Sequence, residues 1–368
     1  MAKPGLKDRL RALIEAEGPI DVARFMALSL ADPEGGYYAT RAPIGASGDF
    51  VTAPEVSQTF GEMIGAALAL HWLATGAPDP FALVELGPGR GTLMADLLRA
   101  ARAVPGFCAA LRLHLVETSP PLIRAQVGAL GGFGPVWHGR IEGLPADLPL
   151  FVVANEFLDA FPVRQYARAG TAWRERLVGC DASGAFAFCL DPRPLPLGAA
   201  LSPAQTAAPE GGIVEAAPAR EALVAALAGR LARQGGVALL VDYGEADLGH
   251  GDTLQAVAGH RKVDPLEAPG GADLTSRVAF GPLLAAARRA GVAAYGPVPQ
   301  GVFLKRLGIG ARLERLAAGA PSKRDDLAAG VARLVEPEGM GDLFKAVALV
   351  AGETVPPGFT AAEAGLAA

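Results

Sequence analysis

A glycine-rich segment, ELGPGRGT at residues 85–92, lies between an apolar run and a stretch with helical periodicity. The apolar run at 81–86 is typical of a buried strand, and Leu93, Leu97 and Leu98 recur with helical spacing behind the glycines. Glycines allow the backbone to pass close beneath a ligand, and free N–H groups at a helix start attract a negatively charged group. The segment predicts a site for a nucleoside cofactor; the alternative is a purely structural turn from strand to helix.

The acid that follows the next apolar run helps to choose the cofactor. Glu117 comes directly after residues 111–116, where a carboxylate can accept hydrogen bonds from both hydroxyls of an adenosine ribose. Enzymes that bind NAD usually carry G-x-G-x-x-G, whereas this loop reads acid-x-G-x-G-x-G with Gly87, Gly89 and Gly91. That spacing is typical of sites for S-adenosylmethionine, which we predict as the cofactor.

Polar residues at the end of a third apolar run are candidates for the reaction itself. The run at 150–154 is followed by Asn155, Glu156 and Asp159, and ligands bind at the carboxyl ends of parallel strands. Carboxylates beside a buried strand are costly unless they meet a cation or hydrogen-bond donors. A guanidinium fits, because it is planar, permanently charged and suited to bidentate contacts. We predict these three residues as catalytic; alternatively, Glu156 caps the following helix and Asp159 is a structural acid.

Two further segments are candidates for cofactor contacts. Residues 48–58, GDFVTAPEVSQ, could fold over the cofactor as a lid, or could only cap the helix that begins behind Ser57. Glu142 follows another predicted strand, the third in chain order, which lies before the apolar run at 150–154. There Glu142 could contact the adenine amine or lie in a solvated loop. No metal site is predicted. The residues predicted to bind the cofactor are Thr52, Gly87, Gly89, Gly91, Thr92, Glu117, Ser119, Glu142 and Asn155.

The order of apolar and helical stretches indicates an α/β fold that would position these residues. Short apolar runs, which include 237–241 and a last predicted strand at 343–350, alternate with helices, as in a parallel sheet covered on both faces. Polar alternation and a proline-rich piece interrupt this order, which indicates an insertion at about 166–215. We predict a helical, cofactor-covering segment at 1–79 and a doubly wound core at 80–368 with a helical extension at about 304–336.

Composition limits the classes of protein. The chain has 368 residues, of which 51% are hydrophobic and 19% charged, so it is not intrinsically disordered. A formal net charge of −5 argues against nucleic acid as the main partner. The 3 cysteines form no CxxC pair, and the start of the chain has no apolar segment typical of a secretory signal, so we expect a cytoplasmic protein. Residues 60–77 are apolar but carry Glu62 and His71, which favours a buried helix over stable membrane insertion.

Several motifs together resemble one known family. They are GDFVTAPEVSQTFGE, VELGPGRGTLMADLLR, LVETSP, ANEFLDAFPVRQ, VDYG, GDTLQAV, DLTSRV and GPVPQGVFLKRLGI, spread over about residues 20–350. In these motifs the chain is similar to the MidA family, which includes the mitochondrial complex I assembly factor that acts as a protein arginine methyltransferase. The resemblance implies a Rossmann-like, seven-strand-type methyltransferase core that uses S-adenosylmethionine. It also implies symmetric dimethylation of an arginine on a core subunit of complex I, in the mitochondrial matrix for eukaryotic relatives.

The resemblance also assigns residues. It implies that the three loop glycines hold the cofactor, that Glu117 binds the ribose, and that Asn155 with Glu156 marks the active-site strand end. The chain departs from the family in DLTSRVAF, where we expect DLTAHVDF, so Arg277 and Ala279 replace a histidine and an acid. Two other functions stay open at this point: an assembly factor that binds S-adenosylmethionine with little catalysis, and a methyltransferase for a small molecule. The sequence does not determine the oligomeric state.

Overall fold

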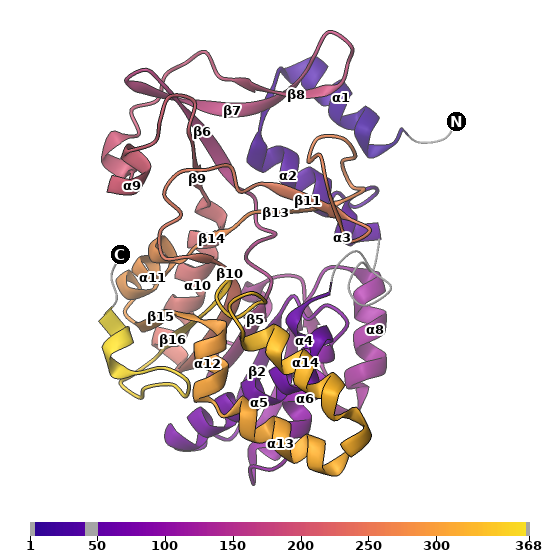
Figure 1. Cartoon of the computed structure of the whole chain (residues 1–368), viewed down its shortest axis with the longest axis vertical. Helices are drawn as coiled ribbons and strands as arrows, with labels where there is room; N and C mark the ends of the chain where they lie inside the picture. The colour runs from indigo at the N-terminus through magenta and orange to yellow at the C-terminus, as the bar shows by residue number, and fades with distance from the viewer. Residues whose placement is uncertain (1–3, 41–50, 366–368) are drawn as a thin grey trace.

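The computed structural model describes residues 4–40 and 51–365. A large mixed sheet occupies the lower half of the molecule as drawn in Figure 1. Its strands are β2 (Phe81–Leu86), β3 (Leu111–Val116), β4 (Val136–His138), β5 (Leu150–Asn155), β10 (Gly236–Glu245), β14 (Val278–Ala279), β15 (Ala293–Pro299) and β16 (Phe344–Val350).

The strand order confirms the predicted doubly wound, Rossmann-like α/β fold. The order is β15-β16-β10-β5-β2-β3-β4, with the short β14 beside β10. Neighbours from β10 to β4 are parallel, whereas β16 runs antiparallel to both β10 and β15. The carboxyl ends of β2, β3 and β5 therefore meet at one edge of the sheet, where the predicted site residues follow them.

Helices cover both faces of this sheet, because side chains along each buried strand alternate between two apolar cores. Leu83 and Val153 point into one core, and Val84 and Val152 into the other. Each of the four is buried, so the strands read as continuous apolar runs. The first core is covered by α5 (Gln58–Ala74), α6 (Thr92–Ala101), α7 (Phe107–Ala110), α12 (Gln300–Arg306), α13 (Ile309–Gly319) and α14 (Arg324–Val335), and the second by α10 (Pro218–Gln234) and α11 (Phe280–Arg289).

The apolar stretch predicted as a buried helix is α5. Ser57 caps it, since its hydroxyl accepts a hydrogen bond from the Thr59 N–H at 3.3 Å. Its backbone lies so close to α6 that a Cβ on Gly65 would lie 2.5 Å from the carbonyl oxygen of Leu97. In the described residues, 4–40 and 51–365, every helix is too short or too polar to cross a bilayer.

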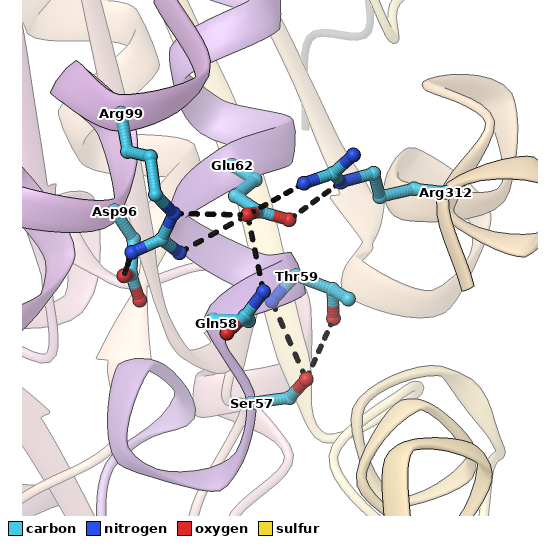
Figure 2. A network of polar contacts seen from close by, with 7 residues as sticks. All are labelled: Ser57, Gln58, Thr59, Glu62, Asp96, Arg99 and Arg312. Atoms are coloured by element: carbon cyan, nitrogen blue, oxygen red, sulfur yellow. Dashed lines mark hydrogen bonds and ion pairs between the residues drawn. The ribbon is translucent and has the colours of Figure 1, made fainter. Parts of the chain in front are cut away.

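A buried glutamate connects α5 to the predicted helical extension, which corresponds to α12–α14. Figure 2 shows Glu62, 1% exposed, between two arginines. Arg312 of α13 donates to both carboxylate oxygens at 2.7 and 2.8 Å, and Arg99 of α6 donates at 3.0 Å and also pairs with Asp96 at 2.7 Å. The network therefore fixes α13 against α5 and α6.

The upper half of the molecule in Figure 1 contains the predicted insertion. It is an antiparallel sheet of β6, β7, β8 and β9, joined by β1 from the N-terminal segment through Ile20 opposite Val178. Phe25 packs edge-on against Phe186 at 5.7 Å, so the N-terminal helices share a core with the insertion. The elements are α1 (Leu6–Glu17), β1 (Ile20–Asp21), α2 (Val22–Ala31), β6 (Arg164–Ala169), β7 (Ala172–Cys180), β8 (Phe186–Leu190), α9 (Pro203–Thr206) and β9 (Ile213–Ala216).

A third, small antiparallel sheet contacts the main sheet through Gln255, which donates to the Tyr243 hydroxyl at 3.2 Å, and the loop before it contacts the insertion. Asp252, in the GDTLQAV motif, accepts hydrogen bonds from Gln165 and Arg176 of the insertion, and Thr253 donates to Glu215. Through these contacts the motif holds its loop against the insertion. The remaining elements are α3 (Tyr37–Thr40), α4 (Ala53–Val56), α8 (Pro120–Leu130), β11 (Gln255–Ala258), β12 (Arg261–Val263), β13 (Asp273–Thr275) and 3-10 turns at Gly131–Phe133, Ile141–Gly143, Gly198–Ala200, Pro321–Lys323 and Ala361–Gly365.

Candidate active site

A cavity of about 620 Å³ opens at the carboxyl edge of the main sheet. Its walls include residues 87–90 after β2, residues 117–118 after β3 and residues 155–157 after β5. Residues from α2, α3 and α4 line it from the side of the N-terminal segment, among them Tyr38, together with Thr52 just before α4. The structure therefore brings together the three strand ends at which the sequence predicted site residues, with part of the predicted lid.

The glycine loop has a backbone that only glycine adopts readily. The φ angles of Gly87, Gly89 and Gly91 are 64°, 53° and 84°. A Cβ on Gly87 would lie 2.6 Å from a ring carbon of Phe157, so the loop passes directly against the segment after β5. Gly91 precedes α6 without a side-chain cap, which leaves the first N–H groups of α6 available to a ligand.

Glu117 lines the cavity with a carboxylate that its neighbours orient. Its Oε1 accepts hydrogen bonds from the Thr118 and Ser119 N–H groups, both at 2.8 Å. Its Oε2 accepts one from the amide of Gln126 at 3.3 Å. Burial raises the pKa of Glu117 and these hydrogen bonds oppose that effect. Oε2 keeps capacity for the ribose hydroxyls that the sequence predicted there.

Two buried oxygens at the cavity have no partner among the described residues. Glu85, 3% exposed, leaves Oε2 without a hydrogen bond, and Asn155 leaves Oδ1 in the same state. Both residues line the cavity, on neighbouring strands. Burial, with the nearby Glu117 carboxylate, raises the pKa of Glu85 to about 8. Unpaired buried acceptors are costly, so these atoms fit a ligand with a cationic donor, such as the ammonium of S-adenosylmethionine.

Glu156 stands at the end of β5 in an unusual backbone conformation. Its φ of 50° is in the left-handed region, which non-glycine residues seldom adopt. Its Oε1 accepts hydrogen bonds from the Ala53 N–H at 3.0 Å and from the Asn155 amide at 3.1 Å. Burial raises the pKa of Glu156 to about 7, and the charge of Asp159 adds to this rise. The carboxyl can therefore exchange a proton near neutral pH.

The turn that follows Glu156 is held from two sides by buried charged residues. Oδ2 of Asp242 accepts hydrogen bonds from the N–H groups of residues 157, 158 and 159, at 3.2, 2.8 and 3.2 Å. Arg220, 2% exposed, donates to the carbonyls of residues 158, 159 and 161 at 2.7 to 3.2 Å. Asp242 of the VDYG motif therefore supports the turn with its side chain.

The described part of the predicted lid, residues 51–58, makes contacts that cross the cavity. Besides the Ala53 contact, Glu55 accepts a hydrogen bond from the Thr92 hydroxyl at 2.6 Å. Thr52 lines the cavity and is 8% exposed. The helix α14 lies beside α4, where Gly330 is packed against Val56 and Ser57 (Figure 1). Residues 48–50 of the predicted lid lie outside the described residues.

The structure does not bring every predicted residue to the cavity. Asp159 is 7% exposed and buried behind the lining residues, where burial raises its pKa to about 6. Ser119 is buried next to the cavity without lining it, and Gly91 caps α6 just outside the lining. Glu142 is exposed and away from the cavity. Their predicted roles as catalytic or cofactor residues stay predictions.

The segment that departs from the family pattern also lies away from the cavity. Arg277 pairs with Glu245 at 3.4 Å, and Ala279 precedes α11; neither residue lines the cavity. In the described ranges 4–40 and 51–365, no group of three or more His, Cys, Asp or Glu residues is arranged to hold a metal ion.

Sequence reasoning missed Arg220 and Gln126, which hold the turn and Glu117. Arg220 stands on α10 in line with Val224, Leu227 and Leu231, which are buried with it. A charged residue on this apolar face is the signal that could have found it. Gln126 is a single amide in α8. It lies in line with the buried Leu122 and Leu130, so the spacing places a polar side chain on a buried face here too. The spacing does not identify the partners of either residue, because these come from distant segments.

Comparisons with known proteins agree with this geometry. Residues 63–298 match a family model described as an S-adenosyl-L-methionine-dependent methyltransferase. The chain is 37% identical to the mitochondrial protein arginine methyltransferase NDUFAF7 homologue of Drosophila melanogaster, over 94% of this chain and 85% of the relative. It is 36% identical to the mitochondrial protein arginine methyltransferase NDUFAF7 of Homo sapiens, over 92% of this chain and 81% of the relative.

A solved structure shares nearly the whole fold. A protein from Burkholderia thailandensis, bound to S-adenosyl-homocysteine in its crystal structure, superimposes with a TM-score of 0.85 and 30% identity over 97% of this chain and 96% of that one. These comparisons confirm S-adenosylmethionine, the cofactor that the glycine spacing predicts. The chain belongs to the MidA family of S-adenosyl-L-methionine-dependent methyltransferases.

Proposed function

We propose that this protein transfers a methyl group from S-adenosylmethionine to an arginine side chain of a protein substrate. The observation that carries the proposal is the Glu156 carboxylate, which lines the cavity at the end of β5 beside the groups that fit the cofactor. The names of the relatives, which are protein arginine methyltransferases, support the same substrate class.

The hydrogen bonds of Glu156 leave one oxygen for the substrate. Oε1 is occupied by Ala53 and Asn155, and no described residue donates to Oε2. A guanidinium presents N–H donors in a planar fork, and its charge would favour the ionised carboxylate, whose pKa burial has raised to about 7. The site should therefore bind a cationic substrate more tightly than a neutral one.

The chemistry requires a nucleophilic nitrogen on a group that is normally a cation. S-adenosylmethionine supplies a methyl group on a positively charged sulfur. Guanidinium lone pairs are delocalised and the pKa of the group is above about 12. A carboxylate placed against two of its nitrogens localises the positive charge there and leaves more electron density on the third. Glu156 can fill this role and can accept the proton that leaves the methylated nitrogen.

Asp159 has a supporting role in this proposal. Its carboxyl is buried behind the cavity wall, and its charge raises the pKa of Glu156. A second negative charge near the site adds to the attraction for a cationic substrate, whether or not Asp159 contacts the guanidinium directly. Its neighbour Arg220 stabilises the turn and offsets part of that charge.

The finer proposal is symmetric dimethylation of an arginine on a core subunit of respiratory complex I, as a step in assembly, in the cytoplasm of the cell that makes this chain. It follows from the family resemblance. The test is incubation of the purified protein with methyl-labelled S-adenosylmethionine and an extract of a strain that lacks it, followed by mass spectrometry of the labelled protein. We expect dimethylarginine on a complex I subunit. Label on a small molecule, or on lysine, would contradict the proposal.

A further inference from the structure

The side chain of Gln126 connects two parts of the cofactor site that are distant in sequence. Gln126 is 0% exposed in α8. Its Nε2 donates to the carbonyl oxygen of Gly89 at 2.7 Å and to Oε2 of Glu117 at 3.3 Å. Its Oε1 accepts a hydrogen bond from the indole N–H of Trp137 at 2.8 Å. One amide thus contacts the glycine loop, Glu117 and strand β4.

The chemistry of these partners fixes which way the amide points. The Trp137 indole N–H can only donate, so it requires the amide oxygen. The Gly89 carbonyl and the ionised Glu117 carboxylate can only accept, so both require the amide nitrogen. A flipped amide would place oxygen against two acceptors and nitrogen against a donor, which loses all three contacts.

The contact with Glu117 controls the oxygen that is available to the cofactor. Oε1 of Glu117 is occupied by two backbone N–H groups of its own turn, so the orientation of Oε2 decides where a ribose can bind. The same helix supports the glycine loop a second time, because Leu130 of α8 lies 3.2 Å from the position of a Cβ on Gly91.

We propose that Gln126 is a positioning residue for S-adenosylmethionine: it holds the Gly89 backbone and the Glu117 carboxylate in the mutual arrangement that the cofactor requires. It acts through these two groups and need not touch the cofactor itself. Among the described residues, Gln126 is not part of the cavity lining. This inference rests on the family's cofactor and is independent of the arginine substrate.

The test compares two substitutions that preserve volume, Gln126→Glu and Gln126→Met. Gln126→Glu keeps the acceptor for Trp137 but places an oxygen against Gly89 and Glu117, and Gln126→Met removes all three hydrogen bonds. We expect the Kd for S-adenosylhomocysteine, measured by titration calorimetry, to rise at least tenfold in both, with the larger rise in Gln126→Glu. Because the residues act together, combining Gln126→Met with Glu117→Ala should raise the Kd by less than the product of the two single effects.

Gln234 offers a matched control. Its amide nitrogen donates to the carbonyls of Pro145 and Leu148 at 2.9 and 2.7 Å, and its oxygen accepts from Arg230 at 3.1 Å, away from the cavity. Gln234→Glu should lower the melting temperature, by less than Gln126→Glu because Gln234 is only half-buried, yet leave the Kd within twofold of the wild type. The proposal is overturned if the Kd of both Gln126 variants for S-adenosylhomocysteine stays within threefold of the wild-type value.

A measurement on the unmodified protein covers the case in which the variants fail to fold. The chain has 3 tryptophans. The indole N–H of Trp137 is bonded to Gln126, whereas that of Trp72 is bonded to the carbonyl of Pro78 in the core, and Trp173 lies in the insertion sheet. In a nitrogen-15 NMR spectrum, S-adenosylhomocysteine should shift the Trp137 indole signal and leave the other two in place. An unchanged Trp137 signal at saturation would overturn the proposal.

Discussion

The backbone N–H of Ala53 donates a hydrogen bond to the carboxylate of Glu156 at 3.0 Å, across 103 residues of sequence. This contact joins α4, which contributes residues to the cavity wall, to the strand end that carries the candidate substrate acid. With the bond from Thr92 to Glu55, it attaches α4 to both sides of the cofactor site.

The first prediction concerns α4. Cofactor binding should slow amide hydrogen exchange in residues 51–57, because a ligand beneath α4 removes water and favours the closed contacts. Glu156→Ala, which removes the acceptor for Ala53, should make exchange in the same segment faster in the free protein. Residues 181–185, in a distant hairpin turn, are the internal control. If saturating S-adenosylhomocysteine leaves the amide exchange rates of residues 51–57 unchanged, α4 is not a lid.

A second prediction separates two acids that the sequence treated alike. Glu117→Ala should weaken S-adenosylhomocysteine binding by about 1.5–3 kcal/mol, the range for hydrogen bonds to a charged group. Glu142→Ala should leave the affinity unchanged, because Glu142 is exposed away from the cavity. Titration calorimetry measures both. Equal losses would mean that the adenine extends to Glu142 and that the cavity is larger than the lining residues indicate.

Proton release should report on Glu85. The pKa of its carboxyl is raised to about 8 by burial and by Glu117, so the group is mostly protonated at pH 7. A cationic ammonium bound beside it favours the ionised form, and S-adenosylmethionine binding should then release close to one proton. Calorimetry in buffers with different ionisation enthalpies measures this number, which Glu85→Gln should reduce and a pH above about 9 should abolish. A binding enthalpy independent of the buffer at pH 7 would contradict the assignment.

The network of Glu62 predicts a stability difference. Glu62→Ala should lower the free energy of unfolding by about 2–3 kcal/mol, less than for a wholly buried pair because its partners Arg99 and Arg312 are 47% and 28% exposed. Burial tends to raise the pKa of Glu62, but hydrogen bonds from the two arginines lower it below 4.5. The contribution is therefore present above about pH 4.5 and is lost as the pH falls.

The control for that prediction is an exposed pair on the same helical extension. Arg324 and Glu314 are 55% and 64% exposed, so Glu314→Ala should change stability by less than about 1 kcal/mol. Denaturant unfolding measures both variants. A loss for Glu62→Ala no larger than for Glu314→Ala would show that the buried network contributes little.

The sequence was sufficient to predict the core of the sheet and much of the site. Short apolar runs located β2, β3 and β5 to within a residue, because strands buried on both faces consist mostly of apolar side chains. The residues directly after them meet at the cavity for the same geometric reason. Two-residue β1 was not predicted, since its pairing with β7 has no local pattern.

The partners of residues that act through buried polar contacts could not be predicted. An arginine such as Arg220 in a helix normally faces solvent, and only the folded chain brings several carbonyls to it. The left-handed conformation of Glu156 could not be predicted either, because glutamate has no preference for it. Both features arise from contacts between segments far apart in the sequence.

The central claim is that Glu156 positions a cationic arginine for methyl transfer. The direct measurement is the rate of methyl transfer from labelled S-adenosylmethionine to a substrate extract, for the wild type and for Glu156→Gln, with S-adenosylhomocysteine affinity measured in parallel. Asp159→Asn, assayed beside it, shows whether the buried second acid is also required. Glutamine keeps the oxygen that accepts from Ala53 but loses the charge, so transfer should fall by about 100- to 1,000-fold, as for the loss of one electrostatic catalytic group, while the cofactor still binds. Transfer by Glu156→Gln at the wild-type rate would contradict the account.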